Sequence, residues 1–521
     1  MNRKTIAILI GALLLITVAA YSPIEKNNFL SSDDGEQVVN NQDIRQWSLA
    51  GAARIFGSYY VGMYQPLTTL GYAAEYRLFG PDARAFHLDS LALHLLAVGL
   101  VIWLSYLLFD NWLIAILAGS FFALWPTQVE AVAWVSARST LLSSLGILAV
   151  LVAYLYYLRQ PRRWLLALVY LLALLAILCK VSAVILPLLL LLISRLRESN
   201  WKKCLRVTWP LWLLSLLFGL VAIRARQNYG FFVDEKYNWS QSLMLMGASF
   251  TWQIKLLFAP FNLSAFYPQP LLATFSWFWL AIPAAYLAVC WFVRKQKILL
   301  FGLCWFLLQL ILSIQIMPHT IQIGADRYNY LALLGLIWPL LIRLRLLAPS
   351  KRRLAVIGAT ALLAVMAITD WGQAQTWQSD LTLWQNAARI SKSAPIIWYN
   401  LAEVNRASGN YGESLAIADE QLVKHPDYAN FYYLRGLIAL QHNQLYAQAA
   451  ADFQTAIKLQ PALPAYYYNL ALAQSALGQT TAALQNLDLA EVKIAKPKQK
   501  MYLPFIQAQR QLLKNKNNYA K

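Results

Sequence analysis

Long apolar segments, separated by short polar stretches, follow one another along the first 370 residues of the chain. A helix needs about 20 apolar residues to cross a hydrocarbon core of about 30 Å. The pattern therefore predicts about eleven membrane crossings, several of them short. They are 5–22, 88–108, 112–125, 140–158, 164–179, 181–194, 207–223, 277–293, 298–316, 328–342 and 354–370. Since apolar segments continue far beyond the first one, that segment is predicted to be a retained helix and not a signal peptide.

The pattern changes after residue 371, where the sequence repeats with a longer period. Aromatic anchors at Trp398, Tyr432 and Tyr467 lie 34 and 35 residues apart. Turn-forming residues recur at matching places, and these are Gly409, Gly478, Pro426 and Pro461. This spacing is typical of the tetratricopeptide repeat, a helix pair that buries its apolar face only by stacking on its neighbours. An unrelated helical domain with chance periodicity is the alternative.

Together these patterns predict an all-α protein with two domains. Residues 1–370 form a polytopic membrane domain, and residues 371–521 form an α-solenoid of tetratricopeptide repeats. Residues 23–87 form a loop between the first two crossings, and loops of such length tend to carry function. An amphipathic stretch at 241–259 is predicted to be an interfacial or re-entrant helix.

Composition excludes two classes of protein. Hydrophobic residues make up 59% of the chain and charged residues 13%, a balance that excludes intrinsic disorder. The four Cys are too few for a disulfide scaffold.

Charge decides the orientation. The chain has 44 Lys and Arg against 24 Asp and Glu, a formal net charge of +20. In the first 370 residues the basic side chains concentrate in the short segments that lie inside when the N-terminus is cytoplasmic. The excess is therefore a topology signal and gives no reason to expect a nucleic-acid partner. With an odd number of crossings, the loop 23–87 and the repeats lie outside the cytoplasm, across a bacterial plasma membrane or, in a eukaryote, in the endoplasmic reticulum.

Two adjacent carboxylates, Asp33 and Asp34, follow the first predicted crossing in the sequence Ser32-Asp33-Asp34-Gly35. Neighbouring carboxylates repel each other, so a cation, a base or a hydroxyl donor would have to stabilise them. They are therefore candidates for catalysis. A solvated turn or a helix cap before Gly35 is the alternative.

Further ionisable residues lie at predicted membrane depth, where they cost free energy and mark candidate functional sites. They are Glu130, Arg138, Lys180 and Arg327, with Asp326 directly before the last. Helix parity places the first four on the same outer side as Asp34. The alternatives are an ion pair between Glu130 and Arg138 that steadies a loop, and a Lys180 ammonium group that reaches to the interface.

Short motifs follow one another in order along the membrane domain. They are Asp33-Asp34, Tyr64-Gln65-Pro66-Leu67, Phe86-His87-Leu88 with His94, Val129-Glu130-Ala131-Val132-Ala133-Trp134-Val135-Ser136 with Arg138, Lys180 before Leu186-Pro187, and Asp326-Arg327-Tyr328 with Tyr330-Leu331. In this ordered set, followed by the repeats, the chain resembles the GT-C glycosyltransferase superfamily. The resemblance is greatest to the transmembrane and tetratricopeptide-repeat-containing (TMTC-like) protein O-mannosyltransferases. Two positions depart from that family's usual pattern, since Val181 stands in place of an acidic residue and Trp125-Pro126 in place of His-Pro.

The resemblance implies transfer of a sugar, with mannose expected, from a polyprenyl-phosphate donor to an acceptor hydroxyl outside the cytoplasm. It implies that Asp34 is the general base and that Asp33 positions the acceptor or shares the proton. The residues implied to bind the donor phosphate are Arg138, Lys180 and Arg327. The residues implied to position the substrate are His87, Glu130, Asp326 and Tyr328.

The implied partners are an undecaprenyl- or dolichyl-phosphate sugar and a protein or peptide acceptor, modified on Ser or Thr and held by the repeats. The sequence contains no metal-binding motif, so the candidate cofactor is limited to Mg²⁺ or Mn²⁺ held by Asp33 and Asp34. Two other classes stay open. One is a non-catalytic membrane scaffold that recruits partners through its repeats, and the other is a flippase, polymerase or transferase for cell-envelope glycolipid or polysaccharide.

Overall fold

The structure is a computed structural model that describes residues 1–198, 201–229, 237–269, 276–315, 321–494 and 499–519. It consists almost entirely of helices, and the chain divides into two compact units, Met1–Leu383 and Trp384–Lys521. The sequence pattern placed the boundary after residue 370. The structural boundary lies later because the last long helix of the first unit continues to Thr376 and the turn after it packs on that unit.

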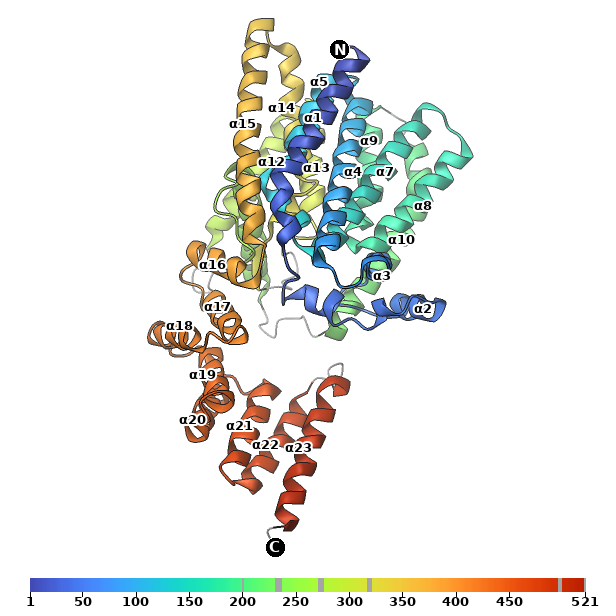
Figure 1. The fold of residues 1–521 in the computed structure, drawn as a ribbon. Coiled ribbons are helices and arrows are strands. Elements are labelled where there is room, and N and C mark those ends of the chain that lie inside the picture. The colour runs from blue at the N-terminus through green and yellow to red at the C-terminus, as the bar shows by residue number, and fades with distance from the viewer. Residues whose placement is uncertain (199–200, 230–236, 270–275, 316–320, 495–498, 520–521) are drawn as a thin grey trace. The chain divides into compact units, whose positions relative to one another are not determined.

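The first unit is a bundle of helices (Figure 1). The helices are α1 (Arg3–Tyr21), α2 (Leu49–Gly57), α3 (Pro66–Phe79), α4 (Ala83–Phe109), α5 (Trp112–Ala123), α6 (Val129–Ala133), α7 (Arg138–Arg159), α8 (Arg163–Cys179), α9 (Leu186–Leu196), α10 (Trp201–Tyr229), α11 (Trp239–Phe258), α12 (Ala281–Phe292), α13 (Lys297–Leu310), α14 (Leu333–Arg343) and α15 (Pro349–Thr376). Short 3₁₀ or π segments that bear on the site are η1 (Ser22–Lys26), η2 (Gly35–Val39), η4 (Pro126–Gln128), η5 (Val135–Ala137) and η9 (Asp326–Asn329). Two short strands, β1 (Tyr267–Pro268) and β2 (Gln322–Gly324), pair antiparallel.

Five helical segments are long and apolar enough to cross a membrane: α1 with η1, α4, α7 with η5, α10 and α15. The pair formed by α5 and η4 with α6 bends by 57° and counts as a sixth if it is one span. Four shorter apolar segments lie at α8, α9, α12 and α13. By length and composition the chain is a multi-pass membrane protein, and the number of eleven crossings stays a prediction.

Several predicted crossings are short because the chain breaks its helices at polar or proline-containing positions. The chain bends at Trp125-Pro126, since Pro126 at the first position of η4 keeps Trp125 extended and so ends the preceding helix. Lys180 is extended, with φ −160° and ψ 134°, and separates α8 from α9. The stretch predicted to be interfacial or re-entrant is a 20-residue helix, α11, that packs on β2 and η9.

The core of the first unit is built around α4. This helix packs along α5 and α7, and α7 packs along α8. Apolar side chains from these four helices belong to one buried cluster. Their packing fixes the helix ends at which the polar candidates lie.

The loop predicted at 23–87 is largely helical and covers one end of the bundle. The Tyr72 hydroxyl of α3 donates to the Val135 carbonyl at 2.8 Å, and the Thr68 hydroxyl donates to the Cys179 carbonyl at 2.9 Å. These bonds place α3 against the beginning of α7 and the end of α8.

The second unit contains three successive helix pairs, each with a 13-residue and a 14-residue helix. The pairs are α17 (Pro395–Ala407) with α18 (Tyr411–Lys424), α19 (Ala429–Gln441) with α20 (Tyr446–Leu459), and α21 (Pro464–Ala476) with α22 (Thr480–Lys493). α16 (Asp380–Ile390) spans the boundary between the units, and α23 (Gln499–Tyr519) follows the last pair. The aromatic anchors each lie in the first helix of a pair, while membership of the tetratricopeptide family stays a prediction.

Candidate functional site

Asp34 is fully buried in the turn between η1 and η2, and both of its carboxylate oxygens accept hydrogen bonds. Oδ1 accepts from the Ser136 amide at 2.8 Å and from the Ser136 hydroxyl, and Oδ2 accepts from the Leu30 amide at 3.0 Å. Burial raises the pKa of Asp34 to about 6, the donors on Ser136 and Leu30 oppose this rise, and the charge of Asp33 adds to it. Asp34 therefore closes the turn and attaches it to η5.

Asp33 stands in a different environment from its neighbour. Its side chain is partly exposed, and no described residue donates a hydrogen bond to its carboxylate. Burial raises the pKa of Asp33, the Arg327 guanidinium lowers it, and the Glu36 carboxylate raises it. Asp33 thus has free acceptor oxygens and a cation close by.

Arg327 in η9 is held in place by α6 and its C-cap. The guanidinium forms an ion pair with Glu130 of α6, and the Arg327 amide donates to the same carboxylate at 2.8 Å. It also lies over two aromatic rings, 4.9 Å from the centroid of Trp134 and 5.2 Å from that of Tyr328. Its side chain keeps 18% exposure, so part of this well-held cation is open to a ligand.

Trp134, which lies against Arg327, also contacts the last residues of the first unit. Its ring stacks on Trp377, with centroids 5.9 Å apart and planes 26° from parallel. Nearby, the Ser31 amide donates to the Asp380 carboxylate at 3.0 Å, and the Asn28 amide donates to the Gln378 carbonyl at 2.9 Å. The segment that leads into the second unit is therefore bonded to the turn that carries the aspartate pair.

Two more cations lie near Arg327. The Lys180 ammonium donates to the Thr140 hydroxyl at 2.7 Å and lies within electrostatic range of Arg327 and of Arg226 in α10. Arg226 also interacts electrostatically with Tyr328. The sequence analysis missed Arg226, because its only sequence signal was a position shortly after a predicted crossing.

We refer to one group of residues at this end of the bundle as the polar site. It consists of Asp33, Glu130, Lys180, Arg226, Arg327 and Tyr328. These residues are brought together from the first loop, from α6, from the end of α8, from α10 and from η9.

Asp326 supports the site from behind. Its buried carboxylate accepts a hydrogen bond from the Tyr267 hydroxyl at 2.7 Å, and burial raises its pKa well above the ordinary value. Tyr267 lies opposite Gly324 in the pairing of β1 with β2. The contact braces η9, so Asp326 positions Arg327 and does not face a ligand itself.

Arg138 has a separate set of partners. Its guanidinium forms ion pairs with Glu75 of α3 and with Asp89 of α4, the latter at 3.1 Å. Its remaining acceptors are the Ser90 hydroxyl at 3.2 Å and the Phe86 carbonyl. The alternative of an ion pair between Glu130 and Arg138 is wrong, because Glu130 pairs with Arg327. Since its donors are occupied and the residue is 1% exposed, the geometry does not favour the expected contact of Arg138 with a donor phosphate.

The two histidines of the sequence motifs lie on α4 and are buried. His94 has its Nδ1 2.7 Å from the Tyr330 hydroxyl and its Nε2 3.2 Å from the Ala123 carbonyl, within the helical core. His87 follows Phe86, whose carbonyl accepts from Arg138. His94 therefore belongs to the packing of α4, whereas His87 is buried and interacts with the backbone of Asn28, and its part in positioning the substrate stays a prediction.

Asp34 is poorly placed to hold a metal ion, and Mg²⁺ or Mn²⁺ at Asp33 stays a prediction. Over the part of the chain that the structure describes, no group of three or more His, Cys, Asp or Glu side chains is arranged to hold a metal ion. The oxygens of Asp34 accept hydrogen bonds from N–H and O–H groups. These donors stabilise the carboxylate and occupy the positions that a metal ion would need.

Comparison with known proteins gives little further information. No model of a known protein family and no curated protein matches the chain. Among solved structures, ArnT from Cupriavidus metallidurans bound to undecaprenyl phosphate is similar over 95% of this chain and 82% of its own. The identity is 12% and the TM-score is 0.40, and a likeness of this size carries no argument about function.

Proposed function

We propose that the protein is a membrane glycosyltransferase that uses a lipid-phosphate-linked sugar as donor. The observation that supports it most directly is the polar site itself, where an accessible carboxylate stands beside a group of cations at one end of an apolar helical bundle. A transferase of this kind needs a base for the acceptor and fixed positive charge for the departing lipid phosphate. The polar site offers both.

The general base in this proposal is Asp33. The sequence resemblance implied Asp34, but the oxygens of Asp34 already accept three hydrogen bonds from Leu30 and Ser136. Asp33 has oxygens free to accept the proton of the acceptor hydroxyl as that oxygen attacks the anomeric carbon. The bond from this carbon to the lipid phosphate breaks in the same displacement, so the anomeric configuration inverts.

The cations of the polar site stabilise the departing phosphate. Arg327 supplies a planar guanidinium that can make two parallel hydrogen bonds, and Lys180 and Arg226 supply further positive charge. Glu130 and Asp326 keep Arg327 in place. Arg327 and Lys180 are held by these bonds before the reaction begins, which is the condition under which charge stabilisation is strongest.

The finer parts of the proposal are the sugar and the acceptor. Mannose and a Ser or Thr hydroxyl of a protein follow from the resemblance to the TMTC-like transferases. The helix pairs of the second unit are the part proposed to hold the protein acceptor. The segment 377–383 connects that unit to the turn that carries Asp33.

The test is a transfer assay on the purified full-length protein. Polyprenyl-phosphate mannose and a peptide rich in Ser and Thr are the substrates, and mass spectrometry of the peptide is the readout. We expect a gain of one hexose and loss of this gain in Arg327→Gln, by about 100-fold or more. Arg84→Gln, which alters an exposed ion pair with Glu25, is the matched control.

If the peptide gains no mass, the proposal of a transferase holds only if the protein uses another sugar donor or another acceptor. The assay is therefore repeated with glucose and aminoarabinose donors and with a glycolipid acceptor. Transfer to the glycolipid alone would correct the acceptor class. No transfer with any of these combinations would favour the membrane scaffold.

A further inference from the structure

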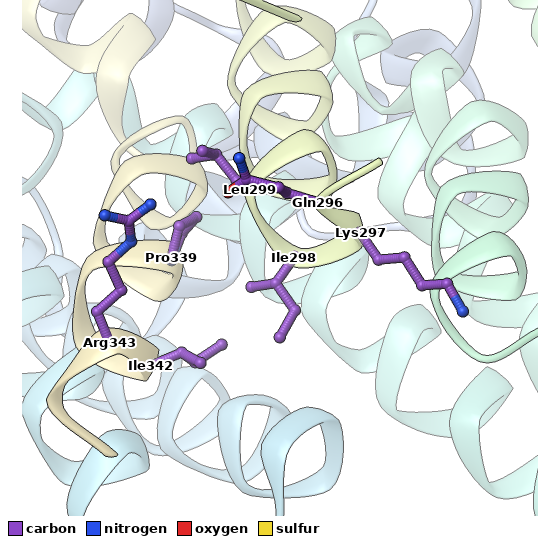
Figure 2. A pocket seen from close by; sticks show the side chains of 7 residues that line it. All are labelled: Gln296, Lys297, Ile298, Leu299, Pro339, Ile342 and Arg343. Atoms are coloured by element: carbon purple, nitrogen blue, oxygen red, sulfur yellow. The ribbon is translucent and has the colours of Figure 1, made fainter. Parts of the chain in front are cut away.

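A cavity of about 270 Å³ lies between the beginning of α13 and the end of α14 (Figure 2). It is lined by Gln296, Lys297, Ile298, Leu299, Pro339, Ile342 and Arg343. α14 begins four residues after η9, and Pro339 is the first α14 residue that lines the cavity, so the first six residues of α14, about 9 Å of helix, and the end of η9 lie between the cavity and Arg327. The cavity is therefore not part of the polar site.

The cavity exists because the two helices touch at one level and separate below it. Gly302 of α13 and Gly335 of α14 face each other so closely that a Cβ at either position would meet the carbonyl oxygen of the other. One turn further along α14, Pro339 lies inside the helix and provides no N–H for the Gly335 carbonyl. Beyond this contact the side chains of Ile298 and Ile342 line the space between the helices.

The walls combine apolar surface with positive charge. Isoleucine, leucine and proline side chains form the interior, and Figure 2 shows Arg343 on the α14 side with Lys297 extending away from it. Lys297 forms an ion pair with Glu198, whereas no described residue pairs with Arg343. The cavity thus presents one arginine whose charge is not compensated within the described chain.

The surroundings have the same sign of charge. Basic residues at this end of the bundle include Arg294, Lys295, Arg345, Lys351, Arg352 and Arg353. Two apolar side chains are also exposed here: Leu340 on α14, which is 61% exposed, and Leu346 directly after α14, which is 85% exposed. An acyl chain could lie along this surface while its headgroup enters the cavity, which is too small for a whole lipid.

We propose that this cavity binds the headgroup phosphate of an anionic phospholipid from the leaflet that faces the basic end of the bundle. Arg343 contacts the phosphate, and the isoleucine side chains contact the glycerol and the beginning of an acyl chain. Basic pockets between membrane helices suit anionic headgroups because both the negative leaflet and the local charge favour them. The inference does not depend on the function proposed for the polar site.

The experiment is a lipid titration of the purified full-length protein followed by native mass spectrometry. The probes are palmitoyl-oleoyl-phosphatidylglycerol and the zwitterionic phosphatidylcholine with the same chains. We expect the anionic lipid to bind at least about fivefold more tightly, the factor that one basic residue near a membrane surface provides. Arg343→Gln should remove most of this preference.

Two further variants make the result specific. Arg353→Gln removes the same charge from α15, outside the cavity, and should reduce the preference much less than Arg343→Gln does. Ile342→Trp fills the cavity without changing charge and should weaken binding of the anionic lipid. The melting temperature of each variant is measured so that a folding defect is recognised, and a photoactivatable phosphatidylglycerol should crosslink to residues 296–299 or to Ile342 in the unaltered protein.

Three results would overturn the proposal. Equal binding of the two lipids would show that charge is not recognised. Equal loss in Arg343→Gln and Arg353→Gln would show a diffuse surface effect. Displacement of the lipid by inorganic phosphate at the same concentration would identify the ligand as a free phosphate and not a lipid.

Discussion

At the residue scale, the two neighbouring aspartates are expected to respond differently to the same substitution. Asp33→Asn should reduce transfer by at least about 100-fold, the usual size of a general-base contribution, with an unchanged melting temperature. Asp34→Asn should reduce transfer and also lower the melting temperature, because an amide cannot accept the bonds from Leu30 and Ser136 in the same way. Transfer rates and thermal unfolding of both variants in the same detergent provide the measurement. A stable, inactive Asp34→Asn beside an active Asp33→Asn would return the base to Asp34.

The same carboxylates determine how activity depends on pH. Burial raises the pKa of both, to about 6 for Asp34, so the ionised form that can act as a base is lost on acidification at a higher pH than for an exposed aspartate. Since Asp33 is the proposed base and its pKa is raised, we expect kcat/KM to fall on acidification at a pH clearly above about 4, the pKa of an exposed aspartate. Asp34→Asn removes a neighbouring negative charge, so the fall in its residual activity should move to lower pH. An acidic limb near pH 4 in the unaltered protein would contradict this.

The raised pKa of Asp34 also has a consequence for stability. Its folded-state pKa lies above the unfolded value, so the folded state binds the proton more tightly. The contribution of this group to the free energy of unfolding is therefore largest below about pH 4 and is lost as the pH rises through about 6.

Arg138 gives a third test at this scale. Arg138→Gln leaves the buried Glu75 carboxylate without its cation, and breaking such a pair costs about 3–5 kcal/mol, while the partly exposed Asp89 loses a weaker contact. We expect a clear fall in melting temperature, whereas Arg84→Gln at an exposed pair should change it little. A normal melting temperature with a raised KM for the donor would instead place Arg138 at the donor phosphate.

The sequence identified most of the polar residues but not their partners. Glu130 and Arg327 are far apart along the chain, and nothing in either motif indicates that they pair. Arg138 stands close to Glu130 in sequence, yet the start of α7 directs it to α3 and α4. Arg226 has no motif at all, so only the packing of α10 reveals it.

At the element scale, the close contact between α13 and α14 should be sensitive to a single methyl group. Gly302→Ala would place a Cβ against the Gly335 carbonyl and the Pro339 ring, and overpacking of this kind costs about 1–3 kcal/mol. Gly358→Ala in α15, where a Cβ would meet no atom within 4 Å, is the control. Thermal unfolding in detergent should show a loss for the first variant only. Equal melting temperatures would show that the two helices separate without cost.

The elements themselves were predictable to the extent that hydrophobic pattern defines them. The break at Lys180 and the helical nature of the repeats could be read from the sequence, since a charged residue between two apolar runs and a regular period are local signals. The helices inside residues 23–87 were not predicted, because α2 and α3 are short and their stability depends on packing against the ends of α7 and α8. The boundary between the units was misplaced because the turn after α15 is polar in sequence but packs on the first unit.

At the scale of the whole molecule, the distribution of charge predicts which ends of the helices face the cytoplasm. In a variant whose native Cys are replaced by Ala, Leu49→Cys on the first loop should react with a membrane-impermeant maleimide on intact cells. Arg353→Cys at the basic end should react only after the membranes are broken. Both side chains are exposed, so access to the reagent depends on the side of the membrane. Labelling of Arg353→Cys on intact cells would reverse the predicted orientation.

The hydrogen bond between Ser31 and Asp380 has a consequence for how binding events communicate. Segment 377–383 is covalently continuous with the second unit, and it is bonded to the turn that carries Asp33. If an acceptor held by the repeats changes the order of this segment, it changes the affinity of the polar site for the donor by some factor. Thermodynamic reciprocity then requires the donor to change the affinity for the acceptor by the same factor. Through the contact between the Ser31 amide and the Asp380 carboxylate, binding of either substrate would then change the affinity for the other.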